Sequence, residues 1–438
     1  MAQDPTLTAA ELLDAWPVLS PEERAEGFAL LQPAEAASLF ESLSPTDQAD
    51  LLAAMPAAER RTWIRLLAPD DCADLIQAAE PDQRAELIAL LDDATRADVS
   101  ALLAYAEDAA GGVMDPRFPR VRPDMRIDEA IPYLRKQAIG NTVPIHYAYV
   151  LDAEQHVLGV LSFRDLLSAP PDARVDAVMT RPVVSVLEDM DQEAVARVFA
   201  EHHFVAIPVV DRENRMKGVV TADDIVDVVE EEATEDIQKM GGSEVLGAPY
   251  LDVSLADMVR KRAWWLAALF IGEMLTATAM GRFQDEIARA VVLALFVPLI
   301  ISSGGNSGSQ ATTLVIRAMA LGEVRLRDWW RVCRREVVVG LGLGLILATL
   351  GILRITVWHA VAQVYGEHWL LLALAVGASL VGVVAWGTIA GAMLPFFLRR
   401  LGFDPASASA PFVATLVDVT GLIIYFTVSA VILRGTLL

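Results

Sequence analysis

The sequence predicts a multidomain protein with an α-helical superhelical N-terminal domain, an α/β domain built as a tandem repeat, and an all-α transmembrane domain of five spans. Three observations predict this fold: regularly spaced prolines in the first hundred residues, a strand and helix pattern that occurs twice in residues 113–232, and long apolar runs after Lys261. We expect the helical array to occupy 1–110, the tandem repeat 111–233, a connecting helix 234–260 and the transmembrane domain 261–438.

The charge of the chain is divided unequally between its two halves. Of 35 basic and 58 acidic residues, 14 and 9 respectively lie from Lys261 onward. The membrane half therefore has a formal charge of +5 (14 minus 9), and the first 260 residues have −28 (21 minus 49). Binding to nucleic acid phosphates needs a basic surface. We expect no nucleic-acid partner and a protein that handles cations.

Cysteine usage and the first residues give two further indications. Only Cys72 and Cys333 are present, one in each half, which argues against a disulfide framework or a cysteine metal site. Residues 1–20 lack the basic, apolar and small-residue order of a signal peptide. We expect the amino terminus to stay in the cytosol.

The first hundred residues contain a repeat of about twelve residues, usually with a proline that precedes acidic residues. The prolines that mark it are Pro21, Pro33, Pro45, Pro56, Pro69 and Pro81. Proline suits the first position of a helix, a capping residue often precedes it, and acidic residues favour the first turn. Each repeat is expected to be one short helix, and such helices are marginal alone. Their apolar faces, with Trp63, should stack as a superhelical array.

Residues 113–232 hold two copies of one pattern. The first copy reads VMDPRFPRVRPDMRIDEAIPYLR and YAYVLDAEQHVLGVLSFRDLL, and the second VMTRPVVSVLEDMDQEAVARVFA and AIPVVDRENRMKGVVTADDIV. These residues resemble a tandem pair of CBS domains, in which two βαββα halves pack as one regulatory module. The resemblance implies sensing of adenine nucleotides or ions. Its implied nucleotide contacts are Tyr147, Phe204, Arg164 and Asp165, although the two aromatic rings are equally expected as core residues.

An acidic helix is expected to connect the CBS pair to the membrane half. The segment VDVVEEEATEDIQKMGG places Glu230, Glu231, Glu232, Glu235 and Asp236 within two helical turns, where like charges repel. A solvated helix in salt tolerates this repulsion. If the acidic residues of the adjoining repeat converge on it, Mg²⁺ or Ca²⁺ would relieve the repulsion, and the compact state would depend on the ion.

Apolar runs at 263–283, 288–320, 337–358, 369–397 and 409–433 are each long enough to cross a bilayer. Basic residues concentrate before the first run, between the second and third, and between the fourth and fifth. They are Arg260, Lys261, Arg262, Arg325, Arg327, Arg331, Arg334, Arg335, Arg399 and Arg400. The positive-inside rule then places the amino terminus inside and the carboxyl terminus outside.

Two features of these runs point to ion transport. The stretch VPLIISSGGNSGSQATTLVIRAMALGE interrupts an apolar pattern with glycines and amides. We expect either irregular backbone that lines a water-filled path or a close contact between helices. Asp418 lies near the middle of the last run and Glu273 in the first. Ionisable groups within spans are costly and usually functional, so Asp418 is expected to contact the ion, and Glu273 either the ion or a neighbouring helix.

The order of acidic helical repeats, paired CBS domains, EEEATEDIQKM, GGNSGSQ and LVDVTG resembles the MgtE family of magnesium channels. The resemblance implies a homodimer with a Mg²⁺-selective pore lined by the second and fifth spans. The implied pore residues are Asp418, Gly305, Asn306 and Thr313. Mg²⁺ is implied to close the pore by binding between the soluble domains and the connecting helix, and the implied regulatory residues are Asp71, Asp191, Glu193, Asp224, Glu232, Glu235 and Asp236.

We therefore expect a Mg²⁺ uptake channel in the inner membrane of a prokaryotic cell, gated by cytosolic Mg²⁺, with ATP as a further candidate ligand. An exchanger of Mg²⁺ against H⁺ or Na⁺ is the alternative within transport. A membrane-anchored receptor for an ion or nucleotide, without transport, is the alternative from another class. An enzyme is not expected, because no nucleophile and base pair, His-rich metal site or phosphate-binding loop is present.

Overall fold

The computed structural model describes residues 7–138, 146–247, 250–251 and 253–436. Contacts within the chain divide it into two compact units, Met1–Glu232 and Ala233–Leu438. The first unit contains the helical array and the CBS pair. The second contains the long apolar helices. Each unit is described separately below.

The helical array confirms the proline pattern in its main features. α2, α3, α4 and α6 each begin at an expected proline, while Pro56 caps α5 and Pro81 lies in the turn before α7. Ser20 and Glu23 form a reciprocal capping box at the start of α2. The helices are α1 (Ala9–Ala15), η1 (Trp16–Val18), α2 (Pro21–Ala29), α3 (Pro33–Ser42), α4 (Pro45–Ala54), α5 (Ala57–Ile64), α6 (Pro69–Ala78), α7 (Arg84–Leu90) and α8 (Asp93–Leu102).

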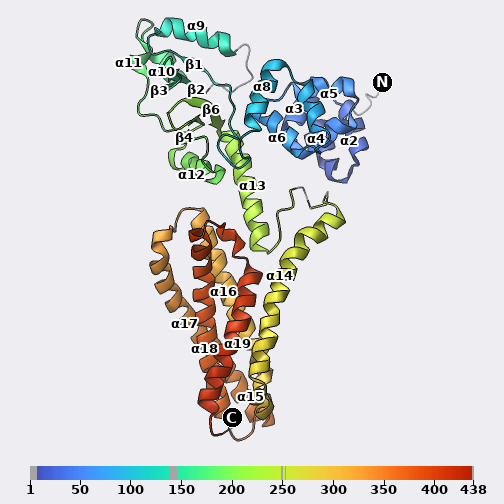
Figure 1. The fold of residues 1–438 in the computed structure, drawn as a ribbon, viewed down its shortest axis with the longest axis vertical. Helices are drawn as coiled ribbons and strands as arrows, with labels where there is room; N and C mark the ends of the chain where they lie inside the picture. The colour runs from blue at the N-terminus through green and yellow to red at the C-terminus, as the bar shows by residue number, and fades with distance from the viewer. Residues whose placement is uncertain (1–6, 139–145, 248–249, 252, 437–438) are drawn as a thin grey trace, which may run out of the picture. The chain divides into compact units, whose positions relative to one another are not determined.

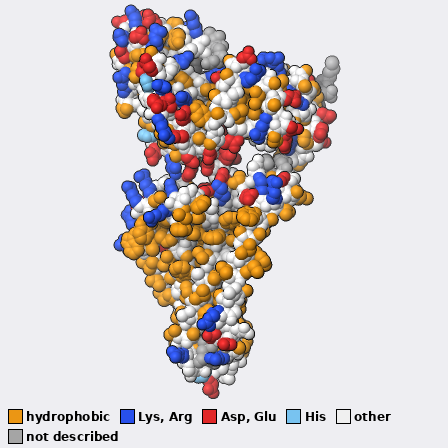
Figure 2. Space-filling view, viewed as in Figure 1, with side chains coloured by type: hydrophobic (Ala, Val, Ile, Leu, Met, Phe, Trp, Pro, Cys, Tyr) orange, Lys and Arg blue, Asp and Glu red, His pale blue; other side chains and the backbone are white. Residues whose placement is uncertain are grey.

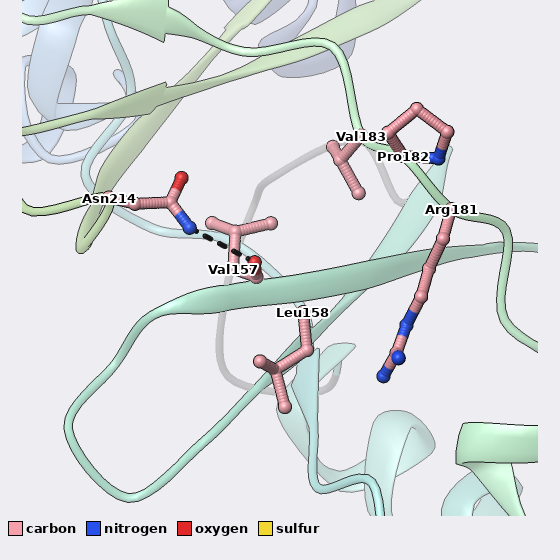
Figure 3. A pocket seen from close by; sticks show the side chains of 6 residues that line it. All are labelled: Val157, Leu158, Arg181, Pro182, Val183 and Asn214. Atoms are coloured by element: carbon pink, nitrogen blue, oxygen red, sulfur yellow. Dashed lines mark hydrogen bonds between the residues drawn. The ribbon is translucent and has the colours of Figure 1, made fainter.

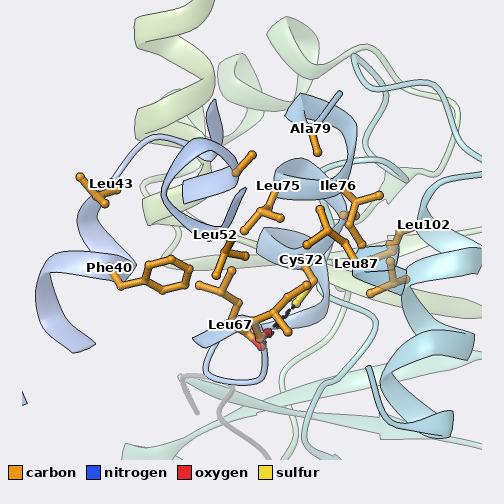
Figure 4. Close-up of a cluster of buried hydrophobic side chains, with 14 of the residues drawn as sticks. Phe40, Leu43, Leu52, Leu67, Cys72, Leu75, Ile76, Ala79, Leu87 and Leu102 are labelled. Atoms are coloured by element: carbon orange, nitrogen blue, oxygen red, sulfur yellow. Dashed lines mark hydrogen bonds between the residues drawn. The ribbon is translucent and has the colours of Figure 1, made fainter. Parts of the chain in front are cut away.

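The array is held together by one hydrophobic core (Figure 4). Phe40, Leu52 and Leu75 are buried side by side from three different helices, and Trp63 packs edge-on against Phe28 with ring centroids 4.8 Å apart. The same core includes Ile207 of the second CBS copy. The array and that copy are therefore packed together within the first unit, which positions α6 beside residues of the CBS pair.

Each CBS copy has the predicted order of elements. In each three-stranded sheet the first strand pairs parallel with the second, and the second pairs antiparallel with the third. The first copy comprises β1 (Arg120–Val121), α9 (Ile127–Ala138), β2 (Tyr147–Leu151), β3 (Val157–Ser162), α10 (Phe163–Ser168) and α11 (Val175–Val178). The second comprises β4 (Val186–Leu187), α12 (Gln192–His202), β5 (Ala206–Val210), β6 (Met216–Thr221) and α13 (Ala222–Met240).

The second unit is a bundle of long helices (Figure 1). Five segments of its described residues are long and apolar enough to cross a membrane, and hydrophobic side chains cover much of its visible surface (Figure 2). Helix α18 packs against α16, α17 and α19, and α14 packs against α19. The elements are α14 (Leu255–Arg282), α15 (Gln284–Arg289), η2 (Val291–Phe296), α16 (Val297–Ala320), η3 (Leu326–Asp328), α17 (Trp329–Ala362), α18 (Trp369–Arg400), η4 (Pro405–Ser407) and α19 (Ala410–Leu433).

The glycine and amide block does not interrupt its helix. α16 runs without a break through Gly304, Gly305 and Gly308, so the expectation of irregular backbone is wrong and that of a close helix contact is confirmed. A Cβ at Gly308 would stand 2.8 Å from Val413 Cγ1 and 2.9 Å from the Gly387 carbonyl oxygen. Neighbouring helices therefore approach the bare backbone closely, and the helical hydrogen bonds satisfy the peptide groups at membrane depth.

Candidate metal sites

The first unit gathers carboxylates from three segments that are distant in sequence. α6 supplies Asp70, Asp71 and Asp74, the segment after α8 supplies Asp115, and α13 supplies the rest. Electrostatic interactions link each member to others of the group. We call this group the acidic cluster; its members are Asp70, Asp71, Asp74, Asp115, Asp223, Asp224, Asp227 and Glu231.

Burial of the acidic cluster disfavours its charged form. Asp115 is 3% exposed and Asp70 is 8% exposed. Burial raises the pKa of Asp74 and of Asp224 to about 7, and that of Asp115 to about 6. Burial, followed by the charges of Asp115, Asp224 and Asp71, raises the pKa of Asp70 well above its usual range. Near neutral pH the cluster therefore favours protons or a cation.

The local fold holds two of these carboxylates in place. The Thr221 hydroxyl and backbone N–H donate to Asp224 Oδ2 over 2.7 and 2.8 Å, which caps the start of α13. Asp115 exchanges two backbone hydrogen bonds with Val219 of β6, and its side chain accepts the N–H of Arg117 at 2.7 Å. The end of β6 thus positions two carboxylates, that of Asp115 and that of Asp224.

The chemistry of the acidic cluster fits a hard divalent cation. Its ligand atoms are all carboxylate oxygens, which Mg²⁺ and Ca²⁺ prefer. Asp70 Oδ1 is buried without a hydrogen-bond partner, and within the described residues no Lys or Arg forms an ion pair with a member of the cluster. No three of these carboxylates bring ligand oxygens within 4.8 Å of one another among the described residues, so a Mg²⁺ ion at the acidic cluster would contact them partly through its own hydration water.

The predicted regulatory residues do not all lie together. Asp71 and Asp224 belong to the acidic cluster. Asp191 instead caps α12, Glu193 pairs with Arg197 at 3.4 Å, and Glu232 accepts a hydrogen bond of 2.8 Å from Gln192. Asp74 and Asp115 are not among the predicted regulatory residues, and Asp70 was expected as a solvated acid at a helix start. The DD pair that opens α6 indicates Asp70, and the VMDP motif indicates Asp115.

Glu235 and Asp236 lie in the second unit, at the end of α13. Glu235 pairs with Lys239, whose ammonium also lies 2.7 Å from Asp404 Oδ2 in the connection between α18 and α19. Met240 packs against the small apolar cluster formed by Ile316, Ala406 and Ala408. The end of α13 is therefore attached to the segment that leads directly into α19.

A second candidate site lies between α16 and α19. A Cβ at Gly305 would stand 3.4 Å from the Ala414 Cβ and 3.8 Å from Asp418 Oδ1. The bare backbone of α16 therefore faces the carboxylate of α19. Asp418 is part-buried and has no ion-pair partner within the described residues.

The other predicted pore residues form an exposed polar stripe on α16. Asn306, Gln310 and Thr313 are all exposed. Their spacing of four and three residues places them on the same face of α16. A bilayer does not satisfy amide groups. This stripe must therefore face protein or water, as a transport path requires.

Three of the four predicted nucleotide residues lie where β2 begins and β3 ends. Tyr147 is the strand partner of Ser162, whose hydroxyl donates to Asp165 Oδ2 over 2.7 Å, and Arg164 lies exposed on the same turn. Phe204 stacks on His202 and packs against the core shared with the helical array, as one of its two expected roles requires. The assignment of all four residues to a nucleotide site stays a prediction.

A pocket of about 480 Å³ lies between the two CBS copies and includes none of these four residues (Figure 3). Arg181 provides a cation on its wall, and Asn214 Nδ2 donates to the Val157 carbonyl over 3.2 Å. The remaining lining residues are Leu158, Pro182 and Val183.

These features define a multi-pass membrane protein that handles cations. It has five apolar helices with a carboxylate among them, and a separate acidic cluster with the chemistry of a divalent-cation site. Three family models match the chain: "Divalent cation transporter" over 297–428, "MgtE intracellular N domain" over 7–108, and "CBS domain" over 110–172 and 175–231.

Two similar proteins of known name show to which family this chain belongs. The magnesium transporter MgtE of Thermus thermophilus is 44% identical over 335 residues, which cover 76% of this chain and 72% of that protein. The magnesium transporter MgtE of Enterococcus faecalis is 31% identical over 333 residues, which cover 76% and 71%. The chain belongs to the MgtE family of magnesium transporters. It is thus a multi-pass membrane transporter with a cytosolic N-terminal domain.

Solved structures also resemble the first unit. The cytosolic domain of the Mg²⁺ channel MgtE in complex with ATP is 42% identical, with a TM-score of 0.47, and the match covers 50% of this chain and 90% of that one. The soluble part of a magnesium transporter is 28% identical, with a TM-score of 0.41, and covers 51% and 98%.

Proposed function

We propose that this protein is a Mg²⁺-selective uptake channel that cytosolic Mg²⁺ closes. The observation that carries the proposal is Asp418, a carboxylate within a membrane span that faces the bare backbone of Gly305. Mg²⁺ releases its water reluctantly, so a carboxylate beside a polar stripe suits an ion that passes with much of its hydration shell. Gly305, Asn306 and Thr313 would line the path next to Asp418.

A homodimer would supply two copies of Asp418 and of the polar stripe to one path. The exposure of Asn306, Gln310 and Thr313 in one chain supports this arrangement, because a second copy or enclosed water must satisfy them. The proposed topology places the carboxyl terminus outside, since the arginines between α16 and α17 mark the cytosolic side.

We place the array at 1–110, the CBS pair at 111–233 and the connecting segment at 234–260. The proposed sensor is the acidic cluster, whose carboxylates come from the first two of these. At high Mg²⁺, bound ions would neutralise the carboxylates of α6 and α13 and stabilise the compact state. At low Mg²⁺, the unneutralised charges would repel and loosen it. Asp191, Glu193, Glu232, Glu235 and Asp236 would take part only if their present contacts rearrange.

The end of α13 would transmit this change within the second unit. Lys239 joins the helix to Asp404, and Trp265 Nε1 donates to Ser409 Oγ over 3.2 Å at the residue that caps α19. Ser309 of α16 donates to the Ala410 carbonyl over 3.1 Å. A displacement of α13 would therefore reach the start of α19 and, through Ser309, the middle of α16.

ATP is a proposed further ligand of the CBS pair. Its support is the grouping of Tyr147, Arg164 and Asp165 where β2 begins and β3 ends, and the ATP complex reported for a similar cytosolic domain. Titration calorimetry with ATP on the wild type and Arg164→Ala tests this assignment. Equal affinities would remove Arg164 from the site.

The function is tested in liposomes that contain the purified protein and a trapped Mg²⁺ dye. We expect influx without any H⁺ or Na⁺ gradient, and a fall in influx as Mg²⁺ rises on the cytosolic face. Influx that requires a counter-ion gradient would establish the exchanger instead. No influx, together with Mg²⁺ binding to the protein, would favour the receptor.

A further inference from the structure

Helix α14 has one packed face, and this face carries a charged residue. Its less exposed residues recur at intervals of three and four, as one side of a helix requires. They are Trp265, Leu269, Gly272, Glu273, Thr276, Ala279 and Met280. The residues between them, such as Phe270 and Leu275, are exposed. Glu273 therefore lies against protein, although a lipid-facing helix has no structural need for a carboxylate there.

Two contacts fix the register of this face against α19. Trp265 donates to Ser409, and a Cβ at Gly272 would stand 3.0 Å from Thr415 Cγ2. The offsets of 144 and 143 residues are nearly equal, so α14 and α19 run in parallel, side by side. Asp418 lies one turn beyond Thr415 on α19. In this register Asp418 lies opposite the part of α14 between Glu273 and Thr276.

Glu273 and Asp418 lie close enough for their charges to interact. Within the described residues, no hydrogen bond or ion pair to a cation satisfies the Glu273 carboxylate. Two carboxylates whose charges interact within a membrane repel, and a nearby cation relieves that repulsion.

Thr276 provides an independent observation at the same place. It is 8% exposed, and its hydroxyl is buried without a hydrogen-bond partner. Threonines in helices usually donate to the carbonyl four residues earlier. Seven in this unit do so: Thr278, Thr312, Thr349, Thr356, Thr388, Thr415 and Thr420. Thr276 instead keeps its hydroxyl available for a ligand outside its own helix.

We infer that Glu273 and Thr276 complete the oxygen ligands of the ion site at Asp418, which makes α14 part of the transport path. This inference rests on the proposed function. The two carboxylates would attract a divalent ion more strongly than a monovalent one, because two charges are neutralised at once. The Thr276 hydroxyl would accept a hydrogen bond from water in the hydration shell of Mg²⁺.

The test measures Mg²⁺ influx into liposomes over a range of Mg²⁺ concentrations, and the preference for Mg²⁺ over K⁺. Glu273→Gln keeps the shape and removes the charge. We expect at least a tenfold higher half-saturating Mg²⁺ concentration and a weaker preference for Mg²⁺. Thr276→Val, which keeps the shape without the hydroxyl, should raise the half-saturating concentration several-fold.

Two matched controls separate a local role from a general effect. Thr278→Val removes a hydroxyl on the exposed side of α14, and Glu336→Gln removes a carboxylate from α17; both should remain within about twofold of the wild type. If Glu273→Gln does not yield folded protein, Glu273→Asp keeps the charge on a shorter side chain and should still alter the half-saturating concentration.

The possible failures are distinguishable. Wild-type concentration dependence and ion preference in Glu273→Gln, while Asp418→Asn abolishes influx, would overturn this inference and leave the proposed function standing. Undiminished influx in Asp418→Asn would overturn the proposed path itself and, with it, the role of α14.

Discussion

Gly305 on α16 and Asp418 on α19 face each other so closely that a Cβ at Gly305 would lie 3.8 Å from Asp418 Oδ1. The added methyl group would make ordinary contacts, so Gly305→Ala should fold normally. It would also occupy space beside the carboxylate that a hydrated ion needs. We expect a several-fold lower Mg²⁺ influx in liposomes at an unchanged melting temperature. Equal influx would show that the ion does not pass between these residues.

A methyl group at Gly308 should reduce the stability of the protein, unlike one at Gly305. Its Cβ would collide with Val413 and the Gly387 carbonyl, so Gly308→Ala should destabilise the helix bundle by roughly 1–3 kcal/mol. Gly342→Ala on α17 is the matched control, since its Cβ meets nothing within 4 Å. Thermal unfolding in detergent measures both. A Gly308→Ala protein as stable as this control would contradict the close helix contact.

The ion pair between Lys239 and Asp404 should influence gating. Lys239→Ala would remove about 0.5–1 kcal/mol from the attachment of α13 to the entrance of α19. We expect the Mg²⁺ concentration that halves the influx to rise by roughly two- to fivefold. Lys217→Ala, which breaks an ion pair with Asp211 in the CBS pair, is the control. The same inhibitory concentration in both variants would exclude the proposed coupling.

The acidic cluster predicts that pH and Mg²⁺ act in opposition. Burial raises the pKa of Asp74 and Asp224 to about 7, above the value of an unfolded chain. The folded state therefore binds more protons than the unfolded state between about pH 4 and 7, and the stability that this contributes is lost as pH rises through 7. Without Mg²⁺ the melting temperature should be higher at pH 6 than at pH 8.

Mg²⁺ should raise the melting temperature more at pH 8, where it does not compete with protons. Asp74→Asn should reduce both effects by removing one charge from the cluster. Asp14→Asn, on the exposed side of α1, should leave them unchanged. An equal Mg²⁺ effect at the two pH values would argue against cation binding by these carboxylates.

The fold followed from local patterns to a large extent. Prolines with capping residues mark the starts of α2 and α4 because both groups have fixed preferences at a helix start. The strand and hairpin pattern, which occurs twice, predicted the CBS pair. The glycines near Gly305 left two expectations open, irregular backbone or a close helix contact. The choice between them depends on the neighbouring helices, which approach an unbroken α16 closely.

The acidic cluster was predicted less completely, because its members come together only through tertiary contacts. Asp224 and Asp71 were identified, but Asp115 lies more than forty residues from Asp70 and approaches it only through its pairing with β6. Asp191 was implied by the resemblance to the family, and in the structure its carboxylate caps α12. Local sequence does not distinguish a capping aspartate from a metal ligand, so its regulatory role stays a prediction.

The most direct test of the account compares Mg²⁺ influx through the wild type and Asp418→Asn, reconstituted at equal density with low Mg²⁺ on the cytosolic face. Asparagine keeps the size of the side chain and removes its charge. Glu336→Gln is the control for loss of a carboxylate elsewhere in the bundle. We predict that Asp418→Asn lowers influx by at least about a hundredfold, or roughly 2.7 kcal/mol, while the control conducts normally. Equal influx through Asp418→Asn and the wild type would contradict the assignment of the ion path.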